Sequence, residues 1–221
     1  ANAGAVIAGA RLARRAGDPS HLEFARRVYD FWLANMVDPL TRQDAHSPLP
    51  DRLSGLVRSG AAAAILEVPA TLYAAGRLRS IVIKGIDPSQ RLLALPTGVL
   101  AGPTPDAGEE IPVLVGARMA KAAGLKRGDT VTLQWKDASG TIDAREARVA
   151  EVMRTPVQSV DVNQVWMSIE TLRSLAAMPG QATLAVLAPG AAPGAPDKGW
   201  RFQSPDELLA DVRALIRSKA V

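Results

Sequence analysis

Apolar and polar residues alternate along much of the chain in a pattern that predicts strands. Ile65 to Tyr73 and Leu78 to Ile86 are two runs rich in β-branched residues, separated by Ala-Ala-Gly-Arg at 74–77. β-Branched residues fit the pleated surface of a sheet, and glycine favours a tight turn. We therefore expect a hairpin over 65–86.

A helix is expected immediately before this hairpin. It begins at Pro50-Asp51, since proline is favoured at a helix start, and ends at Gly60. Alternation then places Ile83 against the helix, while Arg79 and Lys84 emerge toward water.

The longest predicted succession runs from Ile111 to Val152. Gly124 stops its helix in a left-handed conformation, and a five-residue loop joins its last two strands. The expected elements are a strand over 111–116, a helix over 117–123 and strands over 130–135 and 141–152.

The last part of the chain repeats a strand-helix-strand order. A strand over 165–167 is followed by a helix that Ser168 caps and that reaches Met178, and then by a strand over 183–188. Ser204-Pro205-Asp206-Glu207 starts another helix with one apolar stripe. Between the hairpin and the succession above, 98–111 is rich in glycine and proline and predicts a flexible connection.

Composition excludes some classes of function but does not identify one. The 221 residues suffice for one sizeable domain or two small ones. The net charge of +4 with a pI near 9.8 makes nucleic acid or an anionic membrane surface a candidate partner. The 22 acidic residues are interleaved with the basic ones, and no aromatic-basic strand accompanies them. We expect no nucleic-acid partner.

Sequence signals for catalysis or cofactors are absent. The chain has no cysteine and two histidines, which argues against a catalytic zinc site, and it lacks phosphate-cradling and dinucleotide-binding glycine motifs. Adjacent His46 and Ser47 do not form a nucleophile-base pair easily. Glu109 and Glu110 are neighbours on a chain about to enter a strand, so they point apart and are solvated. We expect no catalytic residue, cofactor or metal, although two carboxylates that meet in space leave no trace in sequence.

One aromatic segment is the candidate contact surface. Phe31, Trp32 and Met36 lie in a short stretch that is either a buried anchor or an exposed patch for a partner or substrate. The longest apolar runs, such as 61–66 and 183–188, are far shorter than the ~20 residues of a membrane span. The chain begins without features of a signal peptide and stops within a predicted helix, so we expect an excised fragment.

Several weak motifs in a fixed order resemble one family. These are Ile83-Lys84-Gly85-Ile86-Asp87-Pro88, Gly116 with Ala120, Gly128-Asp129, and Asp161 followed by Val165-Trp166-Met167. Together they resemble the extracytoplasmic domain of FtsX-like ABC transporter permeases of the MacB and LolC/LolE type, over roughly residues 20–215.

The resemblance implies an α+β fold with two subdomains. Residues 18–97 and 155–216 would form a strand-helix-strand layer, called porter-like. Residues 98–154 would form an inserted lobe rich in β-hairpin, called sabre-like, and residues 1–17 would lie near the membrane.

It also implies a non-catalytic domain on the periplasmic side of the bacterial inner membrane. The partners would be an ABC ATPase reached through the membrane part, a second permease copy or paralogue, and a periplasmic protein or a lipoprotein or peptide substrate. The alternatives are a free-standing periplasmic module that binds a peptide or small ligand, and a carboxylate-based enzyme.

Overall fold

The structure, a computed structural model, describes residues 47–106, 108–155, 161–192, 194, 200–202 and 204. The expectations for residues 1–17, for Phe31, Trp32 and Met36, and for the helix that starts at Ser204 concern residues outside this part. Where the chain is described, no helix has the length and apolarity needed to cross a membrane. The described elements are β1 (Ser47–Pro48), α3 (Asp51–Arg58), β2 (Ala62–Ala74), β3 (Arg77–Ile86), η1 (Thr97–Leu100), β4 (Ile111–Gly116), α4 (Ala117–Ala123), β5 (Thr130–Lys136), β6 (Ile142–Met153), β7 (Gln164–Ser168), α6 (Ile169–Leu175), β8 (Gln181–Ala182) and β9 (Leu184–Leu187).

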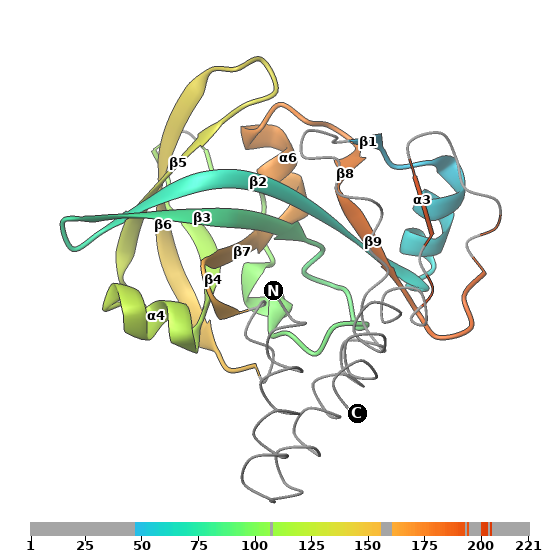
Figure 1. Cartoon of the computed structure of the whole chain (residues 1–221), viewed down its shortest axis with the longest axis horizontal. Coiled ribbons are helices and arrows are strands. Elements are labelled where there is room, and N and C mark those ends of the chain that lie inside the picture. Colours follow the sequence, from blue (N-terminus) through green and yellow to red (C-terminus); the bar gives the residue numbers. More distant parts are fainter. Residues whose placement is uncertain are drawn as a thin grey trace, which may run out of the picture.

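A sheet closed on itself forms the body of the molecule (Figure 1). Seven of the described strands follow the order β3, β7, β4, β6, β5, β2, β9, and an additional pairing of β2 with β3 closes a ring. Closure depends on β2, which pairs with β3 and, over Ala70–Tyr73, with β5. The start of β2, Ala62–Ile65, pairs with β9, which lies outside the ring. β3 pairs with β7 in parallel, as does β4 with β6, whereas the other pairings in the ring are antiparallel.

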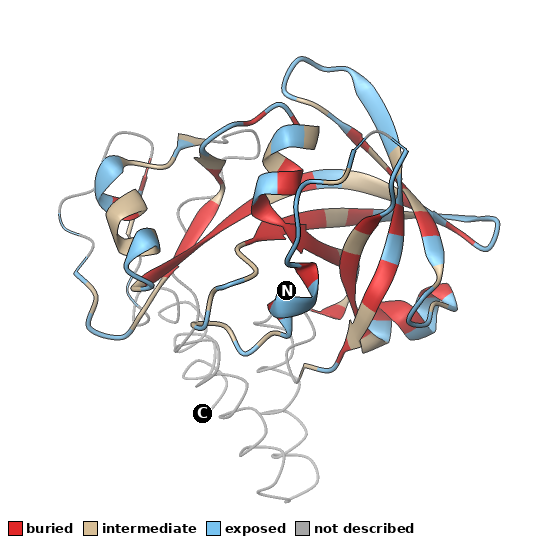
Figure 2. Ribbon diagram, turned by 180° about the vertical axis from the view of Figure 1, so that it is seen from behind, coloured by how far each residue is buried: buried red, intermediate tan, exposed pale blue. Residues whose placement is uncertain are grey.

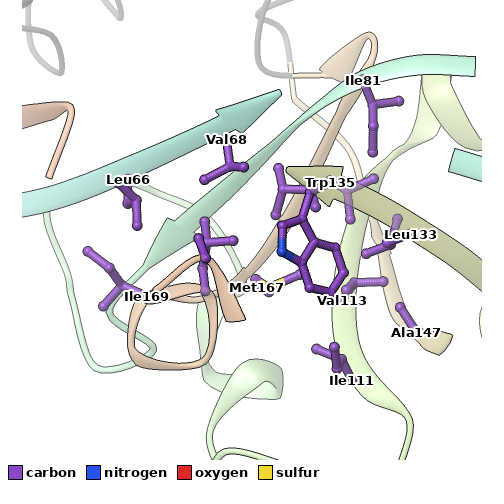
Figure 3. Packing of buried hydrophobic residues seen from close by; sticks show 14 of the residues in the cluster. Leu66, Val68, Ile81, Ile111, Val113, Leu133, Trp135, Ala147, Met167 and Ile169 are labelled. Atoms are coloured by element: carbon purple, nitrogen blue, oxygen red, sulfur yellow. The ribbon is translucent and has the colours of Figure 1, made fainter. Parts of the chain in front are cut away.

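The interior of the ring is a tightly packed apolar core. Trp135 lies among aliphatic side chains from several strands, with Met167 and Ile169 nearby (Figure 3). Its indole Nε1 donates a hydrogen bond to the Leu175 carbonyl at 3.1 Å, which ties the core to the end of α6. Met119, from α4, belongs to the same cluster. Burial of these side chains is the main favourable term for the fold.

Gly85 allows α6 to approach the sheet closely. A Cβ at this position would lie 2.9 Å from the Ile169 Cα and 3.1 Å from a methyl of Leu172. Real Cβ atoms do not approach backbone so closely, so only glycine fits here without a shift of α6.

A second apolar cluster covers the outer face of the sheet. Ile86, Leu114 and Trp166 pack there against Leu100, which is 1% exposed, with Leu93 beside them. The expectation of a flexible connection over 98–111 is therefore wrong at its start, because η1 is packed onto the sheet. The described residues that follow it, up to 110, are mostly exposed.

Most predicted elements between residues 50 and 188 are confirmed close to their expected bounds. The two-residue loop Ala75-Gly76 joins β2 to β3, and Gly124 ends α4 with a φ of 71°. The α+β class is also confirmed in its coarse form, since helices pack on a sheet-rich body.

The expected inserted lobe is not set apart by hydrogen bonding. β5 of the 98–154 block pairs with β2, and β4 pairs with β7, so the sheet runs through both proposed boundaries. The division into porter-like and sabre-like subdomains stays a prediction that no break in the described sheet marks.

Candidate functional site

The motif residues behind the family resemblance form structural contacts rather than a reactive centre. Asp161 is 1% exposed, and its carboxylate accepts hydrogen bonds from the Arg118 backbone N–H at 2.9 Å and from its guanidinium at 2.7 Å. The Arg118 guanidinium also donates to the Thr155 carbonyl at 3.2 Å. Arg118 therefore holds both ends of the connection from β6 to β7.

Gly116 makes room for this carboxylate. A Cβ on Gly116 would overlap the Asp161 Oδ1 and lie 2.6 Å from the Asp161 Cα. Sequence reasoning paired neither residue with the other, because they lie 45 positions apart and nothing local signals the contact.

The Gly128-Asp129 pair closes the tight turn before β5. Gly128 has a φ of 90°, and its N–H donates to the Val149 carbonyl of β6. The Asp129 carboxylate accepts from the Lys126 N–H at 2.9 Å. Both residues thus serve the turn, which is the usual role of aspartate and glycine in such a position.

Lys84 is buried, so the expectation that it emerges toward water is wrong. Its ammonium lies 2.6 Å from the Glu67 carboxylate, directly across the β2–β3 ladder, and 5.3 Å from the centroid of the Trp166 ring. It lies on the face that also carries Ile86, which the segment after β3 covers. An ion pair and a cation-π contact together compensate the burial of its charge.

The neighbouring carboxylates of Glu109 and Glu110 make separate local contacts. Glu110 accepts from the Thr130 hydroxyl at 2.6 Å and lies 3.7 Å from Arg148, while Glu109 accepts from the Asp106 N–H at 3.0 Å. Both glutamates are exposed, as expected. In the described part of the chain no three His, Cys, Asp or Glu side chains could share a metal ion.

Residues near the two ends of the described chain contact each other. β1 pairs with β8, the Leu49 N–H donates to the Gly180 carbonyl at 3.0 Å, and the Trp200 indole donates to the Pro48 carbonyl at 3.2 Å. Trp200 is 7% exposed and packs in the main core. We call Pro48, Leu49, Gly180 and Trp200 the junction. It brings together positions that are 152 residues apart.

Comparisons with known proteins return structural similarity only. No family model matches the chain, and no curated protein matches it. The structure is similar to the extracellular domain of the noncanonic ABC-type transporter YknZ from Gram-positive bacteria, with a TM-score of 0.44, 12% identity, and coverage of 81% of this chain and 93% of that one. It is also similar to the periplasmic region of MacB from Actinobacillus actinomycetemcomitans, with a TM-score of 0.47, 10% identity, and coverage of 78% of this chain and 86% of that one.

Proposed function

We propose that this chain is the extracytoplasmic domain of a bacterial ABC transporter permease. The observation that carries the proposal is the junction, where the segment entering the sheet body and the segment leaving it are held together by the Trp200–Pro48 hydrogen bond. A domain inserted between two neighbouring membrane helices needs its entering and leaving segments side by side. The order of motifs from Lys84 to Met167 supports the same assignment.

The proposed role is mechanical and non-catalytic. ATP hydrolysis by a separate cytoplasmic ATPase would move the membrane helices, and this domain would pass the displacement to a substrate or a periplasmic partner. A packed core resists deformation, so a displacement at the junction moves the whole body. The closed ring of strands and the brace that Arg118 provides suit that role.

The partners proposed from the resemblance are an ABC ATPase, a second permease copy or paralogue, and a periplasmic protein. The substrate would be a lipoprotein, in a release system like LolC/LolE, or an exported peptide or drug. The Ile83-to-Gln90 segment favours the lipoprotein-release type, since it resembles the LolC/LolE sequences more closely.

Labelling in intact bacteria tests the proposed location. Ser139 lies in the exposed β5–β6 loop, and the chain contains no cysteine of its own. In an otherwise cysteine-free full-length protein, Ser139→Cys should react with a maleimide that cannot cross the inner membrane. Leu133→Cys, on a residue with no exposed surface, is the control and should react only after denaturation.

Labelling of Ser139→Cys only after cell lysis would place the domain in the cytoplasm and reject the proposal.

Purification of the tagged full-length protein from membranes should also recover an ATPase. Its absence from every preparation would contradict the mechanical role.

A further inference from the structure

The tip of the β2–β3 hairpin projects from the body of the molecule (Figure 1) and is exposed along most of its length (Figure 2). The two loop residues have positive φ angles, 47° at Ala75 and 72° at Gly76. Such two-residue loops match the twist of the strands they join. The ladder accordingly stays in register out to the pair Ala74–Arg77.

The register determines which backbone groups of β3 face away from β2. Val82 is opposite Pro69, which has no N–H, and the Val82 N–H instead donates to the Asn163 carbonyl. Val82 therefore points its backbone groups away from β2. Because these directions alternate along an antiparallel strand, Ser80 and Leu78 point the same way.

No described strand pairs with Ser80 or Leu78 on that side. The ladder between β3 and β7 covers only Val82 to Ile86, since β7 begins at Gln164. The corresponding positions of β2 are occupied, because Thr71 and Tyr73 pair with β5. We call Leu78, Arg79 and Ser80 the free edge.

The side chains around the free edge differ between its two faces. Leu78 is 62% exposed and lies directly across from Tyr73, which is 41% exposed, so together they form an apolar surface. Arg77 and Arg79 project to the opposite face. Arg79 donates to the Ala122 carbonyl, whereas Arg77 is exposed and makes no ion pair within the described chain.

We propose that the free edge binds an extended segment of a partner protein in which acidic and apolar residues alternate. The segment would add a strand beside β3, exchanging main-chain hydrogen bonds with Leu78 and Ser80. Its apolar side chains would contact Leu78 and Tyr73, and its carboxylates would lie on the face of Arg77. The inference rests on the register and is independent of the proposed transporter role.

Charge favours an acidic partner over a second copy of this chain. Two free edges pairing in antiparallel fashion around Arg79 would place the arginines of both copies side by side. Like charges opposite each other in a sheet are destabilising, whereas opposite charges are favourable. A carboxylate-bearing strand meets this requirement.

Two short peptides test the proposal on the full 221-residue chain. One is a fluorescein-labelled, end-blocked octapeptide of alternating glutamate and valine, and the other alternates lysine and valine. Fluorescence anisotropy should show saturable binding of the glutamate peptide and at least ~10-fold weaker binding of the lysine peptide. Failure of the glutamate peptide to bind in a saturable manner would overturn the proposal.

Matched variants at one position separate edge pairing from other contacts. Ser80→Pro removes the free N–H without removing a hydrogen bond to β2, and should weaken binding of the glutamate peptide by ~10-fold or more. Ser80→Val keeps the N–H and should bind like the parent chain. Arg77→Glu should reverse the preference between the two peptides. A folded Ser80→Pro chain that binds as tightly as Ser80→Val would overturn the proposal.

Hydrogen exchange of the unaltered chain gives a test that does not depend on any variant. The amides of Leu78 and Ser80 should exchange rapidly in the free chain, while those of Arg79 and Ile81, which face β2, are protected. Saturating glutamate peptide should protect Leu78 and Ser80 selectively. Exchange at both positions that stays unchanged would overturn strand addition.

Discussion

At the residue scale, single contacts far apart in sequence decide which substitutions the fold tolerates. The carboxylate of Asp161 occupies the space that a Gly116 side chain would need. It is also the acceptor that holds Arg118 in place. A change at any of the three affects the other two, because they share one buried site.

Gly116→Ala should destabilise the protein by about 3 kcal/mol, because neither the added methyl group nor the Asp161 backbone can move freely. The matched control is Gly55→Ala in α3, where nothing lies within 4 Å of the new Cβ. That control should stabilise the helix by about 0.5–1 kcal/mol. Urea unfolding of both variants checks the prediction, and similar midpoints for the two would contradict it.

The Lys84–Glu67 pair should respond differently according to which partner is removed. The Lys84 side chain is 9% exposed and the Glu67 side chain 28%, so water reaches only the carboxylate readily. Glu67→Gln leaves a buried ammonium without its counter-charge and should cost about 2 kcal/mol. Lys84→Met leaves a hydrated carboxylate, keeps the contact with Trp166, and should cost less than about 1 kcal/mol. Equal losses in a denaturation experiment would show that burial does not govern the pair.

Sequence reasoning could not place Lys84 correctly, and the reason is physical. Alternation predicts a solvated face only when one side of a strand meets water. Here both sides of β3 are covered, one by the interior core and the other by the cluster around Leu100. No residue near Lys84 in sequence signals that a distant segment folds over it.

At the element scale, helices and strands were predictable because their signals are local. The loop Ala75-Gly76, the left-handed Gly124 and the run of β-branched residues in β3 each act within a few positions. Strand partners joined by a short loop, β2 with β3 and β5 with β6, were also predictable. Partners distant in the sequence were not, since nothing local signals that β2 pairs with β5 or β3 with β7. The choice of partner reflects burial of the whole sheet rather than any one segment.

Removal of two hydroxyl groups, those of Ser168 and Thr183, should change the free energy of unfolding by different amounts. Ser168 precedes α6 as expected, but its side chain makes no capping hydrogen bond, so Ser168→Ala should change stability by less than about 0.5 kcal/mol. The Thr183 hydroxyl accepts from the Glu67 N–H at 2.9 Å in the middle of β2. Thr183→Val should therefore cost about 1–2 kcal/mol, as measured by thermal unfolding. The reverse order of losses would indicate that Ser168 caps α6 in solution.

At the scale of the whole molecule, the closed sheet predicts one cooperative unfolding transition. An environment-sensitive dye on Ser139→Cys reports on the 98–154 block, and one on Ser174→Cys reports on α6, outside that block. Because β5 and β2 share hydrogen bonds, the two urea curves should coincide. Two separate midpoints would instead support independent porter-like and sabre-like subdomains.

The pairing of Pro48 with Trp200 has a practical consequence for protein engineering. A domain whose two ends lie close together can replace a surface loop of an unrelated host protein without distorting the fold of that host. Residues 47–202 should therefore fold when inserted into a surface loop of a host protein, with the β2–β3 hairpin tip pointing away from that host.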